Sequence, residues 1–225
     1  GLIIDKFADV FVVEPYSAGY IGIMEWIASS LQSLYPGSRI VVRPDERIAV
    51  KEGADFSKVA KAYPSPDFIE ISENLLRMKV NLKTGHKTGF FLDQRENRLT
   101  LSQYCHGKEV LDCFCYTGGF AISAMLAGAK SASAIDLDEK ALETARENAR
   151  LNSANVTFQH VNAFDHLRMM ISKGMQADIV ILDPAKLAGC TEEISRAHRI
   201  YGDINKLGMQ VVSPGGILLT CSCSG

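Results

Sequence analysis

The sequence predicts an α/β protein in which a small α+β domain precedes a larger domain built on a doubly wound parallel sheet. After about residue 83, apolar segments of strand length alternate with segments of helical periodicity. Residues 108–136 follow the order strand, glycine turn, helix and strand, and they end on a carboxylate. Polar side chains also follow several of the expected strands directly. We therefore divide the chain into domains at 1–82 and 83–225.

The first domain is predicted from alternating and helical patterns of apolar residues. The expected elements are a hairpin over 1–16, a helix over 17–35, a strand over 39–42 and a second hairpin over 68–82. Trp26 and the methionines are expected in the core, because they lie at helical or strand spacing among apolar residues. The sequence does not indicate a function for this domain.

The second domain shows a regular repeat of strands and helices. Helices are expected over 93–101, after Gly119, and over 139–151, 165–171 and 194–212; strands are expected around 110–111 and over 131–135, 156–161, 178–182 and 217–220. Such alternation predicts parallel strands joined by right-handed crossovers. Ligands in these sheets bind at the carboxyl ends of the strands. The residues that follow the five strands are Tyr116, Thr117 and Gly118, then Asp136, Asn162, Asp183, and finally Cys221 and Cys223.

The glycine turn predicts the class of cofactor. Gly118 and Gly119 allow the backbone to approach a ligand closely, and Asp136 at the next strand end suits the two hydroxyls of a ribose. The turn is not G-x-G-x-x-G and contains no P-loop lysine. A cofactor with a ribose and no phosphates, such as S-adenosylmethionine, fits better than NAD or ATP. The alternative is a glycine turn that binds no ligand.

Composition excludes several other classes of protein. The chain is 47% apolar and 22% charged, which is typical of a folded globular protein. It contains neither an apolar run long enough to span a membrane nor a signal-peptide pattern, so we expect a cytoplasmic protein without a membrane partner. The net charge of −2 gives no overall attraction to nucleic acid.

One local stretch is strongly basic. Between residues 77 and 98 the cationic side chains outnumber the acidic ones, and they are Arg77, Lys79, Lys83, Lys87, Arg95 and Arg98, with His86 beside them. This stretch is either a solvated face or a patch that contacts phosphates. Its segment 87–98, KTGFFLDQRENR, has the polarity of a ligand-facing loop. We expect it to line the cleft between the domains and to cover cofactor and substrate.

The cysteines allow three interpretations. Cys221 and Cys223 follow the last strand within TCSCS, where a thiol is either an inert small apolar group or a nucleophile. A zinc site made of Cys113, Cys115, Cys221 and Cys223 is the third, although C-x-C pairs are shorter than the usual zinc loops.

Four segments carry a resemblance to a known family. KTGFFLDQREN, LDCFCYTGGF, LDPAK and LLTCSCSG, in this order, resemble the S-adenosylmethionine-dependent methyltransferases that make 5-methylcytosine in large-subunit ribosomal RNA. The resemblance covers essentially the whole chain. It implies a class I, Rossmann-like methyltransferase domain and a ribosomal RNA partner. It further implies that the N-terminal PUA domain and a final β-hairpin of the family are absent from this chain. The oligomeric state, a homodimer included, stays open.

The resemblance also assigns roles to residues. Cys221 would be the nucleophile that attacks carbon 6 of cytosine, with Cys223 as its support or replacement, and Asp183 would stabilise the charge that develops on the ring. Cofactor contacts would come from Phe91, Asp93, Tyr116, Thr117, Gly118, Gly119, Asp136, Leu137, Asn162, Ala163 and Asp183. Substrate contacts would come from Lys87, Arg95 and Lys186.

The chain departs from the family pattern at two strand ends. Asp183-Pro184 is followed by Ala185, Lys186 and Leu187 rather than by a second proline and an aromatic residue, which could loosen the base pocket. Asn162 stands where an aspartate is common, and its carbonyl could accept a hydrogen bond from an adenine amino group. The alternatives are a methyltransferase for another RNA base and a non-catalytic RNA-binding fragment; a dehydrogenase is disfavoured because G-x-G-x-x-G is missing.

Overall fold

The computed structural model describes residues 1–83, 85, 87–188 and 190–222. The chain forms two compact units, of which one comprises Gly1–Ser72 with Lys79–Asp93 and the other Glu73–Met78 with Gln94–Gly225. The units thus divide the chain at other positions than the expected 82/83. Thr88 Oγ1 donates to Asp5 Oδ2 at 2.5 Å, which ties the segment after residue 79 to the first unit.

A β-hairpin is shared between the two units. It consists of β4 (Phe68–Glu73) and β5 (Leu76–Asn81), as the alternating pattern predicts. Its tip belongs to the second unit, because Asn152 accepts from the Arg77 amide at 2.9 Å and donates to the Arg77 carbonyl at 2.6 Å. These contacts join residues 75 positions apart, which local sequence patterns cannot indicate.

The first unit is a three-stranded sheet covered by helices. Its strands are β1 (Leu2–Phe7), β2 (Val10–Pro15) and β3 (Arg39–Val42), and its helical segments are η1 (Ala18–Ile23), α1 (Met24–Leu34), α2 (Glu46–Glu52) and α3 (Ser57–Ala62). β2 pairs antiparallel with β1 and parallel with β3. The helix expected over 17–35 begins as a 3-10 segment. The sequence pattern does not predict α2 and α3, since both are short and lack an apolar stripe over several turns.

The prediction that Trp26 lies in the core is wrong. Its side chain is 70% exposed, whereas Met24 on the same helix is 1% exposed. Met24, Ile27 and Ala28 face the sheet because residues three and four apart share one side of a helix. Trp26 follows Met24 by two positions and therefore points away from that side.

The second unit contains the predicted parallel sheet. Its strands are β6 (Glu109–Cys113), β7 (Ser131–Asp136), β8 (Val156–His160), β9 (Ala177–Leu182) and β10 (Val212–Thr220). They lie in the order β10-β9-β6-β7-β8, and every pairing is parallel. The strand order reverses between β6 and β9, so a ligand is expected at their carboxyl ends. β10 begins earlier than predicted and shifts register between Val212 and Ile217.

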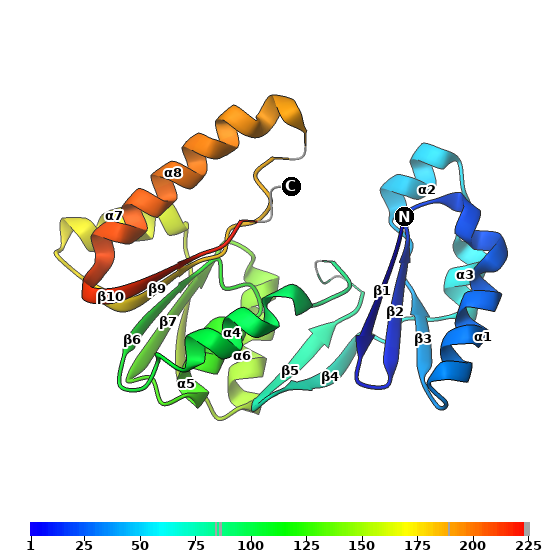
Figure 1. Ribbon diagram of the computed structural model, residues 1–225, viewed down its shortest axis with the longest axis horizontal. Coiled ribbons are helices and arrows are strands. Elements are labelled where there is room, and N and C mark those ends of the chain that lie inside the picture. The colour runs from blue at the N-terminus through cyan, green and yellow to red at the C-terminus, as the bar shows by residue number, and fades with distance from the viewer. Residues whose placement is uncertain (84, 86, 189, 223–225) are drawn as a thin grey trace. The chain divides into compact units, whose positions relative to one another are not determined.

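Helices cover both faces of this sheet, as Figure 1 shows. They are α4 (Arg95–Ser102), preceded by η2 (Leu92–Gln94), α5 (Gly119–Leu126), α6 (Glu139–Leu151), α7 (Ala163–Ser172) and α8 (Ile194–Val211), with the short η3 (Thr191–Glu193) before α8. One core joins α4, α5 and α6 to the sheet through residues such as Leu101, Phe120 and Leu142. The other joins α7 and α8 to the opposite face through Leu167 and Ile204. Class I, Rossmann-like architecture is confirmed.

No helix in the described part of the chain is long and apolar enough to cross a membrane.

Candidate functional site

The loop after β6 has an unusual backbone. Phe114, Tyr116 and Gly118 all have positive φ, at 65°, 49° and 85°. Such angles are costly for residues with a side chain, and they tend to persist where surrounding contacts enforce them. Here the amide of Tyr116 donates to Asp136 Oδ2 at 2.8 Å, and Gly118 N donates to the Cys115 carbonyl at 2.8 Å. The loop is therefore held in shape by β7 and by its own turn.

The side chains around Gly118 and Gly119 explain why both positions are occupied by glycine. A Cβ on Gly118 would lie 3.2 to 3.3 Å from Ile122, Ala145 and Phe158, and one on Gly119 would lie 3.3 Å from Arg98 Cδ. Both positions must stay small so that α5 and α6 pack beside the sheet and Arg98 fits against α5. Contact of a ligand with Gly118, Gly119, Tyr116 or Thr117 stays a prediction.

Arg98 is a buried structural cation rather than part of a solvated patch. It is 4% exposed, and it donates to both carboxylate oxygens of Glu73, from Nε and Nη2, at 2.7 Å each. Paired and bidentate contacts of this kind are what make a buried charge tolerable. Arg98 thereby links α4 to the tip of the β4–β5 hairpin.

Asp136 at the end of β7 carries a half-buried carboxylate. Its Oδ2 accepts from Tyr116 N, and its Oδ1 accepts from Asp138 N at 2.9 Å. An ionised carboxylate offers about four acceptor positions, so each oxygen retains capacity for a further donor. The two amides also fix the direction in which the carboxylate points.

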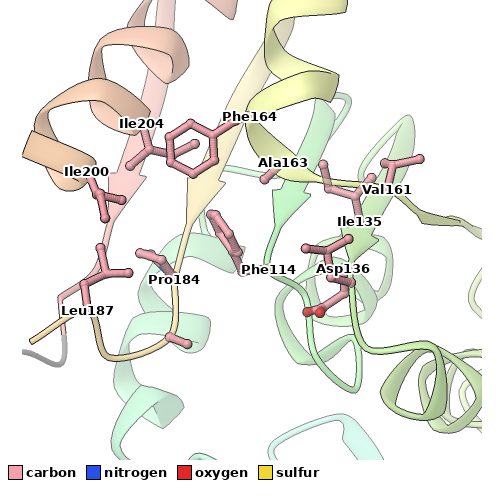
Figure 2. Close-up of a pocket in the computed structure, with 12 residues that line it drawn as sticks. Phe114, Ile135, Asp136, Val161, Ala163, Phe164, Pro184, Leu187, Ile200 and Ile204 are labelled. Carbon is pink, nitrogen blue, oxygen red and sulfur yellow. The ribbon is translucent and has the colours of Figure 1, made fainter. Parts of the chain in front are cut away.

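A pocket of about 270 Å³ lies beside Asp136, and the other described residues that line it are apolar. The lining residues are Phe114, Ile135, Asp136, Leu137, Val161, Ala163, Phe164, Pro184, Ala185, Leu187, Ile200 and Ile204. In Figure 2 the Asp136 carboxylate lies on one side of the pocket, with Leu187 and Ile200 on the other. The pocket thus brings together Asp136, Leu137 and Ala163, three of the residues predicted to contact the cofactor.

The composition of this pocket fits an adenosyl group. The apolar walls suit a flat heterocycle, and the fixed carboxylate suits ribose hydroxyls. None of the described residues that line the pocket is a lysine or arginine that would neutralise a pyrophosphate. The residues present therefore fit S-adenosylmethionine better than a dinucleotide.

Asn162 caps a helix with the same side-chain oxygen that is predicted to accept a hydrogen bond from the adenine amino group. Its Oδ1 accepts from Phe164 N at 2.9 Å and from Asp165 N at 3.4 Å, at the N-terminus of α7. An adenine amino group would have to compete with these two amides. The predicted contact through this carbonyl has weaker geometric support than the contact at Asp136.

A second cluster forms where β9 and β10 end. Gln94 Nε2 donates to Asp183 Oδ2 at 3.2 Å, and Gln94 Oε1 lies 3.8 Å from Cys221 Sγ, which donates to it. Cys221 N donates to the Leu182 carbonyl at 2.8 Å, and Asp183 N donates to the Cys113 carbonyl at 3.4 Å. Asp183 and half-buried Cys221 thus contact the same amide at the carboxyl edge of the sheet. Cys223 lies outside the described residues.

The cysteines and the acid of β6 lie in a different environment. Asp112, Cys113 and Cys115 are buried, and burial raises the pKa of all three groups. For Asp112 the negative charges of Asp183 and Asp136 add to that effect. Buried thiols of this kind are inert. Among the described residues no group of three or more His, Cys, Asp or Glu side chains could hold a metal ion, so the zinc interpretation has no support there.

Several side chains of the predicted basic stretch form ion pairs. Lys83 pairs with Asp67, Lys87 with Asp93 at 2.9 Å, and Arg95 with Glu73 at 3.5 Å. The segment 87–98 is divided between the units, because residues up to Asp93 belong to the first and Gln94 begins a stretch of the second. The predicted cofactor contacts of Phe91 and Asp93 and the substrate contact of Lys87 thus belong to the first unit and stay predictions.

Two predicted substrate residues belong to the second unit. Arg95, on α4, has a half-exposed side chain next to Glu73. Lys186 is exposed and follows Ala185, which lines the pocket. Ala185 and Leu187 form small apolar parts of the pocket wall. The contacts of Arg95 and Lys186 with RNA stay predictions.

The sequence patterns do not predict several residues of the site. They are Gln94 and Asn97 next to the second cluster, and Phe114, Phe164, Ile200 and Ile204 around the pocket. Phe114 lies inside the LDCFCYTGGF motif, so the motif could have indicated that Phe114 is a site residue. Ile200 and Ile204 lie four residues apart on α8, a spacing that indicates only an apolar helix face.

Comparison with known proteins places these features in context. Residues 60–224 match the family model described as S-adenosylmethionine-dependent methyltransferase. A curated relative from Aeromonas salmonicida, named ribosomal RNA large subunit methyltransferase I, is 42% identical over the whole chain. The chain spans 58% of the length of that relative.

Solved structures share the fold. SMU.776, described as a candidate methyltransferase and crystallised with SAH, has a TM-score of 0.79 at 23% identity, over 98% of this chain and 57% of its own. A SAM-dependent methyltransferase from Agrobacterium tumefaciens has a TM-score of 0.68 at 18% identity, over 100% of this chain and 71% of its own. Identities this low indicate the fold alone.

Proposed function

Because the chain belongs to the S-adenosylmethionine-dependent methyltransferase family, we propose that it methylates carbon 5 of a cytosine in large-subunit ribosomal RNA through a covalent Cys221 adduct. The observation that carries this proposal is the pairing of Cys221 and Asp183 on one amide at the carboxyl edge of the sheet. The name of the Aeromonas salmonicida relative supports the RNA substrate.

Cytosine chemistry explains why a thiol is needed. Carbon 5 of cytosine is too weak a nucleophile to take a methyl group directly. The Cys221 thiolate adds to carbon 6, and the electron pair of the C5–C6 double bond then makes carbon 5 nucleophilic. After methylation a base removes the proton from carbon 5, the double bond re-forms, and the thiolate leaves. Thus the thiol is consumed and regenerated within one turnover.

Asp183 is the group proposed to contact the base. A carboxyl group that donates a proton or a hydrogen bond to the polar edge of the ring would stabilise the negative charge that builds up there during the attack. The Gln94 amide already directs one Asp183 oxygen toward the cluster. Cys221 would supply the nucleophile and Asp183 the electrostatic stabilisation.

The apolar pocket beside Asp136 is the proposed cofactor site. Asp136 would accept hydrogen bonds from the ribose hydroxyls, and Phe114, Val161 and Phe164 would enclose the adenine. When bound, S-adenosylmethionine supplies an electrophilic methyl group on a sulfonium. Pro184 and Ala185 line the same pocket and directly follow Asp183, so the proposed cofactor site and the cluster of Asp183 and Cys221 would be adjacent just after β9.

The alternative functions make different demands on the cluster. A methyltransferase for an exocyclic nitrogen needs an aromatic residue to stack the base and needs no cysteine, whereas this chain has Leu187 and Cys221 there. A non-catalytic RNA-binding fragment would bind RNA without any transfer of a methyl group. The half-buried Cys221 next to a polar amide favours the enzyme.

Covalent trapping tests the proposal. Large-subunit rRNA transcript that contains 5-fluorocytidine should form a stable adduct in the presence of S-adenosylmethionine, because fluorine replaces the proton that must be removed. Peptide mapping should locate the adduct on Cys221, and Cys221→Ala should abolish it while exposed Cys190→Ala serves as the matched control. An adduct on Cys223, or methylation of normal RNA by Cys221→Ala, would overturn the assignment.

A further inference from the structure

Gln94 lies between the two groups to which the proposed function assigns the chemistry. It ends η2 just before α4, and its side chain makes no capping bond to that helix. Instead the amide contacts Asp183 and Cys221, which are 89 and 127 positions away in the sequence. A residue at the start of a helix thus directs its side chain to the site rather than to the backbone of the helix.

The partners of Gln94 fix the orientation of its amide. Asn97 Nδ2, which can only donate, lies 2.6 Å from Gln94 Oε1. The Asp183 carboxylate can accept from Gln94 Nε2. A flipped amide would place oxygen against carboxylate and nitrogen against nitrogen. The oxygen therefore faces Cys221, and only a protonated thiol can donate to it.

We propose that Gln94 is a positioning residue, which holds the Cys221 thiol and the Asp183 carboxylate in one fixed arrangement through the two ends of its amide. This inference rests on the proposed function. The nitrogen directs Asp183 Oδ2, and the oxygen holds the Cys221 S–H in its protonated form until substrate displaces the contact. Asn97 in turn holds the amide in this orientation.

The proposal predicts opposite effects of Gln94→Ala in two assays. Loss of positioning should slow formation of the Cys221 adduct with 5-fluorocytidine RNA by about 10- to 100-fold. Loss of an acceptor that favours the protonated thiol should speed alkylation of Cys221 by iodoacetamide by about two- to fivefold, the equivalent of a weak hydrogen bond. In Gln94→Ala the affinity for SAH and the KM for RNA should stay within about twofold of the wild-type values, since in this proposal Gln94 contacts neither the cofactor nor the RNA.

Controls separate positioning from damage to the fold. Gln103→Ala makes the same change at the exposed end of the same helix and should leave both assays unchanged. The buried thiols Cys105, Cys113 and Cys115 are internal reporters, because partial unfolding would raise their alkylation together with that of Cys221. If Gln94→Ala proves unfolded by this criterion, Asn97→Ala is the second variant. It removes an exposed side chain and should slow the adduct by about three- to tenfold by freeing the amide to rotate.

Failure of this inference and failure of the proposed function would give different experimental results. An unchanged adduct rate in folded Gln94→Ala, or in Asn97→Ala where that variant is needed, would overturn the inference while leaving the cytosine chemistry standing. Alkylation of Cys221 that stays at the wild-type rate in Gln94→Ala would overturn it equally. Failure of the wild-type chain to form any adduct would count against the cytosine-5 proposal, and the alkylation assay would still test the contact between Gln94 and Cys221.

Discussion

The ends of β6 and β10 carry the same residue type at one edge of one sheet, in different environments. Cys113 and Cys115 are buried at the central strand, where burial raises the pKa of each thiol. Cys221 directly follows β10, an edge strand of the sheet, and it is half-buried and in contact with the Gln94 amide. Position within the sheet, rather than residue type, therefore determines how far each thiol is exposed.

The acids at this edge differ in the same way. Asp112 is 1% exposed and accepts one amide bond, from Ala121 N at 3.0 Å. Asp136 is half-buried, accepts two amide bonds, and lines the pocket. A carboxyl in the first environment serves packing, while one in the second can bind a ligand with its remaining acceptor positions. Substitutions at each pair test the contrast.

The largest effect is expected from exchanging the two kinds of cysteine for alanine. Cys221→Ala should lower methyl transfer by more than about 1,000-fold, because the proposed nucleophile is lost. Cys115→Ala should retain the wild-type rate per folded molecule and cost about 1 kcal/mol of unfolding free energy through a small cavity. Single-turnover transfer from labelled S-adenosylmethionine and urea unfolding measure the two quantities. A large loss of transfer in folded Cys115→Ala would contradict the comparison.

The sequence predicted the second unit well because its signals are local. Strand-length apolar runs, the helix over 139–151 and polar residues at strand ends each depend on neighbouring residues, and the structure confirms these elements. The helices α2 and α3 and the exposure of Trp26 were not predicted, since short helices and single faces depend on packing. Gln94 was missed for the same reason, because its partners are 89 and 127 positions away.

The next effect concerns the acid that lines the pocket. Asp136→Ala should weaken SAH binding by about 1–3 kcal/mol, because the ribose loses a charged hydrogen-bonding partner and the Tyr116 amide loses its acceptor. Isothermal titration calorimetry measures the change, and Asp165→Ala, at an exposed acid on the neighbouring α7, is the control. Unchanged affinity in Asp136→Ala would show that the cofactor does not bind at this strand end.

A smaller effect, on stability, should show whether packing or the approach of a ligand requires a glycine at position 118. Gly118→Ala is expected to cost about 1–2 kcal/mol of stability without any cofactor, since the new Cβ adds strain at positive φ and meets three side chains. Gly174→Ala is matched, because Gly174 also has positive φ but has open space around its Cβ. If the two variants lose the same stability in chemical denaturation, crowding by α5 and α6 is not what requires a glycine.

The smallest effect is expected on the pH dependence of stability, through Asp112. Burial first, and then the charges of Asp183 and Asp136, raise the pKa of this carboxyl well above its ordinary value of 3.8. The folded chain therefore binds a proton here that the unfolded chain has already lost, so wild-type stability falls as pH rises from about 4 toward the folded pKa. Asp112→Asn retains an acceptor for Ala121 N and cannot ionise, so it should lack this loss. Thermal unfolding of both proteins between pH 5 and 8 should show the variant gaining stability relative to wild type as pH rises. A constant or opposite difference would mean that Asp112 is ionised in the folded protein.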